Sequence, residues 1–316
     1  MKRLRMKEVK HQRRLERATQ VFALSILLLL AVMFTACSSS KLEARDDNRG
    51  TAPQRIVSLT PSTTEILAGV GAFPRVVAVS DYCKYPPEVE RLPRVGGWQN
   101  TNIERIAALR PDLVVFTDAQ TPFVKDRFES LGIRTAAVKS RTLDDALAAI
   151  TEIGRATGNT EQANGLLKET QRQLDEVRAR TQNLSRPRVL CVVDRAPGTL
   201  RDVYAATKES FIAQLIEIAG GEVIAPSSRS GYGQISKEAI LSFDPEIIID
   251  MVQGAEAGGM LAEDSEAVWR ELAEVRAVKA NRVYPIADVS VLHPSQFVGT
   301  TARRFAELIH PEVFAR

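Results

Sequence analysis

The 316-residue sequence lacks the common signatures of catalytic chemistry. It has no Gly-x-Ser-x-Gly turn, no phosphate-binding loop ending in Gly-Lys-Ser/Thr, no His-Glu-x-x-His pair and no closely spaced pair of cysteines. Histidine is scarce as well, since the chain has three and one of them is His11 near the N-terminus. We therefore predict that the protein is not an enzyme.

Cysteine is equally rare, with Cys37, Cys83 and Cys191 in the whole chain. Cys83 and Cys191 are enough for one disulfide if the protein is exported to an oxidising compartment. Cys191, however, lies within the apolar run 189–193, which predicts a residue buried in a strand. Whether the two cysteines pair stays open at this point.

The sequence also has little that could span a membrane. Residues 21–36 form an uncharged apolar run, but 16 residues make only about 24 Å of helix, against a hydrocarbon core of about 30 Å. Eight Lys and Arg against two Glu precede this run in residues 1–20. This arrangement is typical of a secretory signal, and we predict one over residues 1–36 of an exported protein.

The excess of positive charge is confined to this leader. The whole chain carries a net charge of +3, of which residues 1–36 carry +6, so that the remainder carries −3. The basic balance therefore gives no reason to expect a nucleic-acid partner.

Small residues precede Cys37, and a polar stretch follows it up to residue 54. This segment is similar to a bacterial lipoprotein cleavage site, although Phe34 stands where leucine is usual. Lipidation of Cys37 would make residues 37–54 a flexible linker that tethers a soluble domain to the periplasmic or outer face of a membrane. The alternative is ordinary signal cleavage, which would leave Cys37 lost or unmodified.

After the linker, apolar runs typical of strands alternate with helical segments, which predicts an α/β fold of parallel sheets with helices on both faces. The runs are 56–59, 76–79, 113–116 and 136–138, then 188–193, 247–249 and 282–286. Between the two groups, apolar residues recur at steps of three and four over residues 160–184, which indicates one long helix that stops before Pro187. We predict two similar lobes, 55–157 and 187–316, joined by a rigid helix within 158–186. A surface helix of one larger domain is the alternative.

A repeat at an offset of 134 residues supports two similar lobes. Trp98 and Glu104 in the first copy match Tyr232 and Glu238 in the second. In both copies a short polar residue precedes a helix of about two turns, and a proline and an apolar strand follow it. Each lobe therefore carries one aromatic residue and one carboxylate at the same place.

Five motifs of the first lobe resemble one known family. They are Pro-Ser-Thr-Thr-Glu at 61–65, Tyr-Cys-Lys-Tyr-Pro-Pro-Glu at 82–88, Gly-Gly-Trp-Gln at 96–99, Asn-Ile-Glu-Arg-Ile at 102–106 and Arg-Pro-Asp-Leu-Val at 110–114. Their order, followed by a lobe-joining helix, resembles the substrate-binding proteins of ABC importers for cobalamin, iron siderophores and haem, most closely the cobalamin-binding branch.

The resemblance implies a monomeric carrier that holds a small molecule in the cleft between its lobes. It also implies that Glu104 and Glu238 dock into arginine pockets of an ABC permease, which works with its ATPase. A plainer reading of these glutamates is favourable interaction with the helix dipole, worth ~0.3 to 1 kcal/mol each. The matched pair favours docking.

For the ligand, the resemblance places Trp98 and Tyr232 on opposite walls of the cleft, which suits a macrocycle with a flat apolar face. Tyr82 and Tyr85 follow a predicted strand and are further candidates, because ligands of open α/β sheets bind at the carboxyl ends of strands. Asp288 resembles the acid that closes the cobalamin pocket. No resident cofactor or metal is expected, and the bound ligand is expected to be a corrinoid or an iron chelate.

The sequence after Asp288 departs from the cobalamin pattern, because residues 289–294 lack the expected aromatic and arginine. Iron siderophores and haem therefore stay open as ligands. Arg195, with Arg201, is the candidate cation for an anionic siderophore. His293, Tyr82 and Tyr204 are the candidate haem ligands, although a single histidine before a proline is more often solvated. A tetrapyrrole chelatase is an enzymatic alternative and would need His293 as a proton acceptor. The predicted export signal argues against this enzyme.

Overall fold

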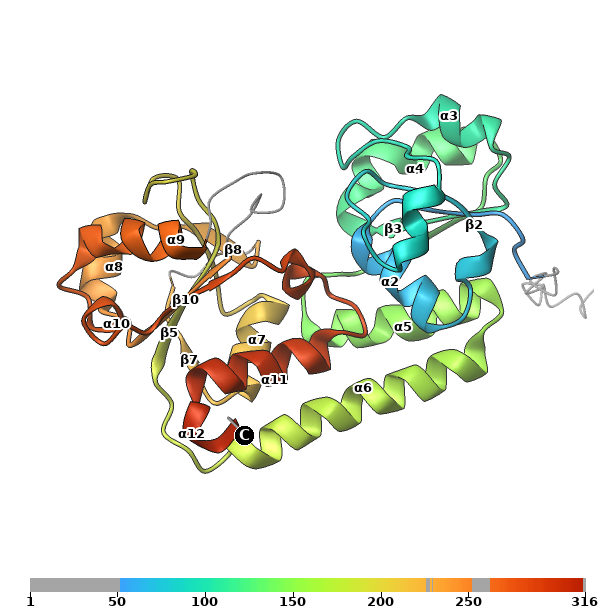
Figure 1. The fold of residues 1–316 in the computed structure, drawn as a ribbon. Coiled ribbons are helices and arrows are strands. Elements are labelled where there is room, and N and C mark those ends of the chain that lie inside the picture. Colours follow the sequence, from blue (N-terminus) through green and yellow to red (C-terminus); the bar gives the residue numbers. More distant parts are fainter. Residues whose placement is uncertain (1–51, 226–227, 229, 252–261, 315–316) are drawn as a thin grey trace, which may run out of the picture. The chain divides into compact units, whose positions relative to one another are not determined.

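The computed structural model describes residues 52–225, 228, 230–251 and 262–314 (Figure 1). The predicted signal peptide, Cys37 and nearly all of the predicted linker lie outside the described residues. Within the described ranges, each helix is either too short or too polar to cross a bilayer.

The first half of the chain forms a four-stranded sheet in which all neighbours are parallel, as the sequence predicts. Its spatial order is β2-β1-β3-β4, with β1 (Ile56–Ser58), β2 (Val76–Val79), β3 (Leu113–Thr117) and β4 (Thr135–Val138). Its helices are α2 (Pro61–Gly69), α3 (Ile103–Ala108), α4 (Thr121–Ser130) and α5 (Leu143–Thr157), with short 3₁₀ turns η1 (Phe73–Arg75), η2 (Pro87–Arg91) and η3 (Asp118–Gln120).

Alternating side chains of this sheet enter two separate hydrophobic clusters. Ile56 and Leu113 point into a cluster shared with α2 and α5, while Val57 and Val114 point into a second cluster shared with α3 and α4. Both faces of the sheet are therefore covered by helices, which explains why its strands read as continuous apolar runs.

The second half forms a six-stranded sheet that mixes parallel and antiparallel neighbours. Its strands are β5 (Arg188–Asp194), β6 (Tyr204–Ala206), β7 (Glu222–Val223), β8 (Tyr232–Gln234), β9 (Ile247–Met251) and β10 (Val283–Ile286). Strands β7, β5, β9 and β10 are parallel, whereas β6 and β8 pair in antiparallel fashion on the edge of β5. The sequence predicts β5, β9 and β10, whereas β6, β7 and β8 are too short to show a period.

The helices of the second half are α7 (Phe211–Ile218), α8 (Lys237–Phe243), α9 (Ala262–Trp269), α10 (Arg276–Lys279), α11 (Val298–Ile309) and α12 (Pro311–Phe314), with 3₁₀ turns η5 (Arg270–Leu272) and η6 (Val289–Leu292). Helices α7 and α11 pack on one face of the sheet, and α9 and α10 contribute to the cluster on the other face.

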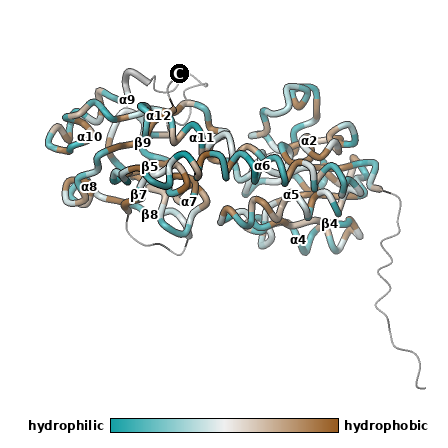
Figure 2. Tube along the Cα trace, turned by 90° about the horizontal axis from the view of Figure 1, so that it is seen from below, coloured by the Kyte–Doolittle hydropathy of each residue, from teal (hydrophilic) through white to brown (hydrophobic). Residues whose placement is uncertain are grey.

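A single helix, α6 (Thr160–Thr181), joins the two halves and ends one turn earlier than the sequence predicts. It lies beside α5 of the first half and α11 of the second, and Figure 2 follows it from one to the other. Its predicted apolar stripe is the buried face, including Ala163, Leu174 and Val177. At ~1.5 Å per residue its 22 residues span about 33 Å.

The sequence repeat is also a structural repeat. Asn102 caps α3 and Ser236 caps α8, each by accepting a hydrogen bond from the backbone N–H three residues on. The strands that follow, β3 and β9, both pair with the first strand of their own half. The two copies therefore place Glu104 and Glu238 at the same position of equivalent helices.

Candidate ligand-binding site

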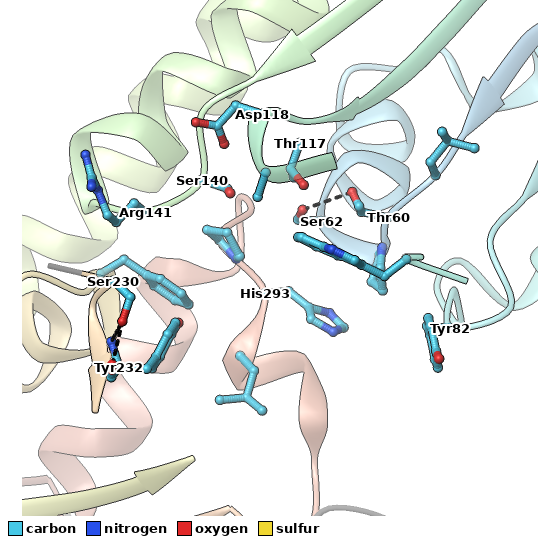
Figure 3. Close-up of a pocket in the computed structure, with 17 residues that line it drawn as sticks. Thr60, Ser62, Tyr82, Thr117, Asp118, Ser140, Arg141, Ser230, Tyr232 and His293 are labelled. Atoms are coloured by element: carbon cyan, nitrogen blue, oxygen red, sulfur yellow. Dashed lines mark hydrogen bonds between the residues drawn. The ribbon is translucent and has the colours of Figure 1, made fainter. Parts of the chain in front are cut away.

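A cavity of about 520 Å³ is lined by residues from both halves (Figure 3). From the first half they are Leu59, Thr60, Pro61, Ser62, Tyr82, Trp98, Thr117, Asp118, Ala119, Ser140 and Arg141, and from the second half Phe211, Ser230, Tyr232, Leu292, His293 and Pro294. The cavity brings together three of the aromatic residues predicted from the sequence: Trp98, Tyr82 and Tyr232.

The fold places this cavity at the carboxyl ends of the first sheet. Residues 59–62 follow β1, residues 117–119 end and follow β3, and residues 140–141 follow β4. Loops at these ends converge on one edge of a parallel sheet, where open α/β folds bind their ligands. The second half contributes the start of α7, strand β8 and the segment 292–294.

Tyr82 lies against the glycine turn that precedes Trp98. Gly96 has a φ of +91°, a conformation that side-chain-bearing residues rarely adopt. The N–H of Gly97 donates to Oδ1 of Asn100 at 2.8 Å, and a Cβ at Gly97 would stand 2.9 Å from the Tyr82 ring. The missing side chain therefore lets Tyr82 approach the turn that carries Trp98.

Tyr232 comes from strand β8 and is partly buried in the core of the second half. This burial raises the pKa of the Tyr232 phenol to about 12, so its hydroxyl stays protonated at physiological pH. Tyr232 can therefore offer an aromatic face and a hydroxyl donor to a ligand, but it does not supply a phenolate.

Hydroxyl groups line the side of the cavity formed by the first sheet. Thr60 caps α2 and its Oγ1 lies 3.4 Å from Oγ of Ser62. Thr117 and Ser140 stand at the ends of β3 and β4. The cavity thus combines aromatic side chains with a row of small polar groups that can bind the polar edges of a ligand.

Two charged residues of the cavity were missed from the sequence: Asp118 and Arg141. Asp118 is exposed, and the backbone carbonyl of Arg141 accepts a hydrogen bond from Phe211 N–H at 2.8 Å, which connects the two halves. Both residues come within three positions of a predicted strand end. Tyr82 is a candidate because it follows a strand, where open α/β sheets bind ligands. The same criterion applied after the third and fourth predicted strands selects Asp118 and Arg141.

Tyr85 and Asp288 line a different cavity of about 220 Å³. The Tyr85 ring meets Phe297 edge-on, with centroids 5.1 Å apart. Asp288 accepts hydrogen bonds from the N–H and hydroxyl of Ser290 and pairs with Arg304 at 3.3 Å. Partial burial raises the pKa of Asp288, but the bonds from Ser290 and the charge of Arg304 outweigh it and lower that pKa. The structure therefore separates these two residues from Trp98 and Tyr232.

Arg195 does not reach the cavity, contrary to its assignment as a candidate ligand contact. Its side chain is 3% exposed, and its guanidinium pairs with the fully buried Asp250 at 2.7 Å. Arg195 directly follows strand β5, and its guanidinium binds Asp250 of strand β9 in the interior of the second half. Arg201 and Tyr204 are exposed and are also absent from the described cavity lining.

Cys83 and Cys191 are both buried and unpaired. Burial raises the pKa of each thiol, so neither is activated as a nucleophile or ligand. Across the residues that the structure describes, no three His, Cys, Asp or Glu side chains converge to hold a metal ion. His293 lines the main cavity, and its Nδ1 lies 2.6 Å from Oε1 of Glu65.

Glu104 and Glu238 lie outside the cavity, exposed in the first turns of α3 and α8. A hydrogen bond from its own backbone N–H and one from Ser236 lower the pKa of Glu238, so this carboxylate is ionised at neutral pH. Their symmetric placement was predicted from the repeat.

Two sheet-centred halves, one connecting helix and a cavity at the carboxyl strand ends define a two-lobed ligand-binding protein. Comparison with known proteins agrees, because the chain belongs to the periplasmic binding protein family, which matches residues 56–289.

Relatives of similar sequence include a transporter substrate-binding protein and a vitamin B12-binding protein. The chain is 28% identical over 269 residues to YvrC, an uncharacterised ABC transporter substrate-binding lipoprotein of Bacillus subtilis, covering 83% of this chain and 82% of that protein. It is 28% identical over 200 residues to the vitamin B12-binding protein of Pectobacterium carotovorum, covering 62% and 71%.

Solved structures confirm the fold. The periplasmic vitamin B12-binding protein BtuF of Vibrio cholerae matches with a TM-score of 0.70 and 24% identity, over 84% of this chain and 99% of that one. A periplasmic heme-binding protein of Pseudomonas aeruginosa matches with a TM-score of 0.71 and 23% identity, over 83% and 94%.

Proposed function

We propose that this protein is the substrate-binding component of an ABC importer and that it captures cobalamin or a related corrinoid between its two halves. The observation that carries the proposal is the cavity that Trp98 and Tyr82 of the first half line together with Tyr232 of the second half. One relative named for ABC transport supports the role in import, and another named for vitamin B12 binding supports a corrinoid cargo.

The chemistry of the cavity suits a corrinoid. A large ring compound with amide-bearing edges needs flat apolar walls for its face and neutral hydrogen-bonding groups for its rim. The aromatic residues supply the walls, and hydroxyls such as Thr60, Ser62 and Ser140 supply the rim. Asp118 and Arg141 add one charge of each sign, so the lining has no excess of positive charge for a polyanionic siderophore.

Delivery to the membrane would use the two exposed glutamates. Glu104 and Glu238 present one carboxylate from each half at equivalent positions, which fits a permease built of two similar subunits. Arginine pockets on the permease would complement them, because guanidinium groups bind carboxylates in a bidentate geometry. The ATPase of the importer would act on the permease and would not touch this chain.

Membrane attachment would come from lipidation of Cys37 after removal of residues 1–36. The name of the Bacillus subtilis relative as a lipoprotein supports this part of the proposal. An acylated Cys37 with the linker 37–54 would keep the binding domain near its permease as a tethered monomer.

Haem or another iron chelate is the second candidate cargo. The observation in its favour is His293, an imidazole on the cavity wall that can act as a metal ligand. Heme-binding proteins occur among the structures with this fold, which is compatible with the idea but shows the fold alone.

Fluorescence titration tests the proposal. Cobalamin or cobinamide at micromolar concentration should quench Trp98, because a corrin absorbs at the emission wavelength and would lie against its ring. The chain has a second tryptophan, the fully buried Trp269, so the Trp98→Phe variant gives the background of indirect quenching. Haemin is titrated in parallel. If neither corrinoid changes the Trp98 emission and haemin quenches it, haem replaces the corrinoid as the proposed cargo.

A further inference from the structure

His293 stands between the main cavity and a buried carboxylate of the other half. It lines the cavity, and in Figure 3 its ring lies between Tyr82 on one side and Tyr232 on the other. Its Nδ1 lies 2.6 Å from Oε1 of Glu65 in helix α2. The two side chains are 20% and 3% exposed, so the contact is shielded from solvent on the side of Glu65.

Two more bonds fix the segment that carries this imidazole. Ser295 Oγ donates to the second carboxylate oxygen of Glu65 at 2.5 Å, and Gln296 Nε2 donates to the backbone carbonyl of Glu65 at 2.9 Å. Residues 293–296 are therefore tied to one residue of α2 by three hydrogen bonds. A side chain anchored in this way has one orientation relative to the cavity wall.

The pairing also assigns the proton of the ring. A carboxylate oxygen is the natural acceptor for an imidazole N–H, so the short contact is satisfied when Nδ1 of His293 carries the hydrogen. In the neutral imidazole Nε2 then presents a lone pair. Among the described residues, no hydrogen bond to this Nε2 is made. The ring edge that does not face Glu65 is the edge left for the cavity.

We propose that Nε2 of His293 coordinates the metal of the bound macrocycle and that Glu65 is the positioning residue for it. The inference rests on the proposed function and adds a requirement on the cargo: its metal must have an exchangeable axial position. Imidazole is a good ligand for cobalt and iron, and a carboxylate on the opposite nitrogen both orients the ring and increases its basicity. The cavity would therefore favour a ring compound with a labile axial ligand over one with both axial sites firmly occupied.

Aquacobinamide is the probe, because its cobalt carries exchangeable water. Its absorbance spectrum on binding should shift as it does with free imidazole. The His293→Gln variant should still show Trp98 quenching. The absorbance spectrum of aquacobinamide bound to this variant should match that of the free probe, and the affinity should be at least tenfold lower than for the wild type. Dicyanocobinamide, whose axial positions are filled, should bind the wild type and His293→Gln equally. His310→Gln is the matched control, since His310 is buried beside Gly220 and outside the cavity lining.

The role of Glu65 is tested by two variants. Glu65→Ala removes the acceptor and should weaken aquacobinamide coordination by about 10- to 100-fold, the usual effect of losing a partner behind a metal-bound histidine. Glu65→Gln keeps a carbonyl acceptor for Nδ1 and should restore the shifted spectrum with much of the affinity. A purely structural role for Glu65 would change the stability of these variants and leave the spectrum of the bound probe unshifted from wild type.

The outcomes separate this inference from the function on which it rests. Quenching of Trp98 by aquacobinamide without any change in its absorbance spectrum would refute coordination and leave corrinoid binding in place. Absence of quenching by aquacobinamide, dicyanocobinamide and haemin would overturn the proposed function itself.

Discussion

At the scale of single residues, the direction of a side chain, more than its position in the sequence, decides whether it belongs to the ligand site or to the core. Arg195 follows β5 directly, yet it faces the interior, where Asp250 also accepts hydrogen bonds from Ser265 and from Trp269 Nε1. A carboxylate that is 0% exposed needs these donors, because an uncompensated buried charge is very costly. The guanidinium of Arg195 is therefore part of the core and not part of the ligand site.

Replacing Arg195 tests this assignment. Arg195→Met should lower the free energy of unfolding by about 3 kcal/mol, because it leaves the Asp250 charge buried without its main partner. Urea denaturation measures the loss, and corrinoid affinity of the folded fraction should be unchanged. Arg303→Met is the matched control in an exposed pair with Glu307, where about 0.5 kcal/mol or less is expected. A loss of ligand affinity without a loss of stability would contradict a structural role.

The two buried thiols give a second prediction. Burial raises the pKa of Cys83 and of Cys191, so at pH 8 the folded protein contains less thiolate than a free cysteine would give. Iodoacetamide should therefore modify both residues much more slowly in the folded protein than in urea, as measured by peptide mass spectrometry. A peptide in which Cys83 and Cys191 are linked would contradict the unpaired state.

Part of the site could be predicted residue by residue. A repeat marks Trp98 and Tyr232, the family resemblance places them at the ligand cleft, and Tyr82 is a candidate because it follows a strand. Tyr85, three residues beyond Tyr82, turns to a different cavity and packs on Phe297, a contact between residues more than 200 positions apart. This separation of Tyr85 from Tyr82 could not be predicted from the sequence. It depends on how the chain after β10 returns to the first half.

At the scale of elements, the repeat extends to how each sheet is started. Asp112 accepts hydrogen bonds from the backbone N–H groups of Gln54 and Arg55, and its own N–H donates to the Arg55 carbonyl. Glu246 does the same for Arg188, with Oε2 accepting at 2.8 Å. In both halves, a carboxylate just before β3 or β9 holds the start of the neighbouring leading strand, β1 or β5.

Removing either carboxylate should therefore have a similar cost. Asp112→Ala and Glu246→Ala should each lower the free energy of unfolding by about 1–2 kcal/mol. Asp112 loses charge-assisted bonds from two backbone N–H groups, and Glu246 loses one from a backbone N–H and one from Arg276. Urea denaturation measures both, with Glu152→Ala on the exposed side of α5 as a control expected within about 0.5 kcal/mol of wild type. A neutral effect of both variants would show that the backbone bonds alone hold these strand ends.

Strands and helices with a clear pattern of apolar residues were predictable from the sequence, and those without such a pattern were not. The parallel strands of both halves read as apolar runs, and the buried stripe of α6 has helical spacing. Strands β6 and β8 have three residues each, and their pairing depends on a turn back along the edge of β5. Such short strands carry no periodic signal, because tertiary pairing defines them.

At the scale of the whole molecule, the halves are connected by more than α6. Helix α11 of the second half packs along α6, and the segment before α11 is bonded to Glu65 of the first half. Leu143 N–H in α5 also donates to Gln214 Oε1 in α7 at 2.6 Å. With these cross-connections, we expect the separation of Glu104 from Glu238 to change little when ligand binds, which is what a two-point contact with a permease requires.

That requirement yields the last prediction. Glu104→Arg and Glu238→Arg together should abolish ligand uptake in cells while leaving ligand affinity in solution unchanged, because both side chains are exposed and neither lines the cavity. Each single variant should lower uptake at least tenfold, since an arginine in place of a carboxylate would repel an arginine pocket. The control is Glu152→Arg together with Glu161→Arg, which makes the same change of charge at exposed positions outside α3 and α8. Reduced uptake in the control to the same extent would attribute the effect to net charge, whereas full uptake in the Glu104/Glu238 variant would remove these glutamates from the contact with the permease.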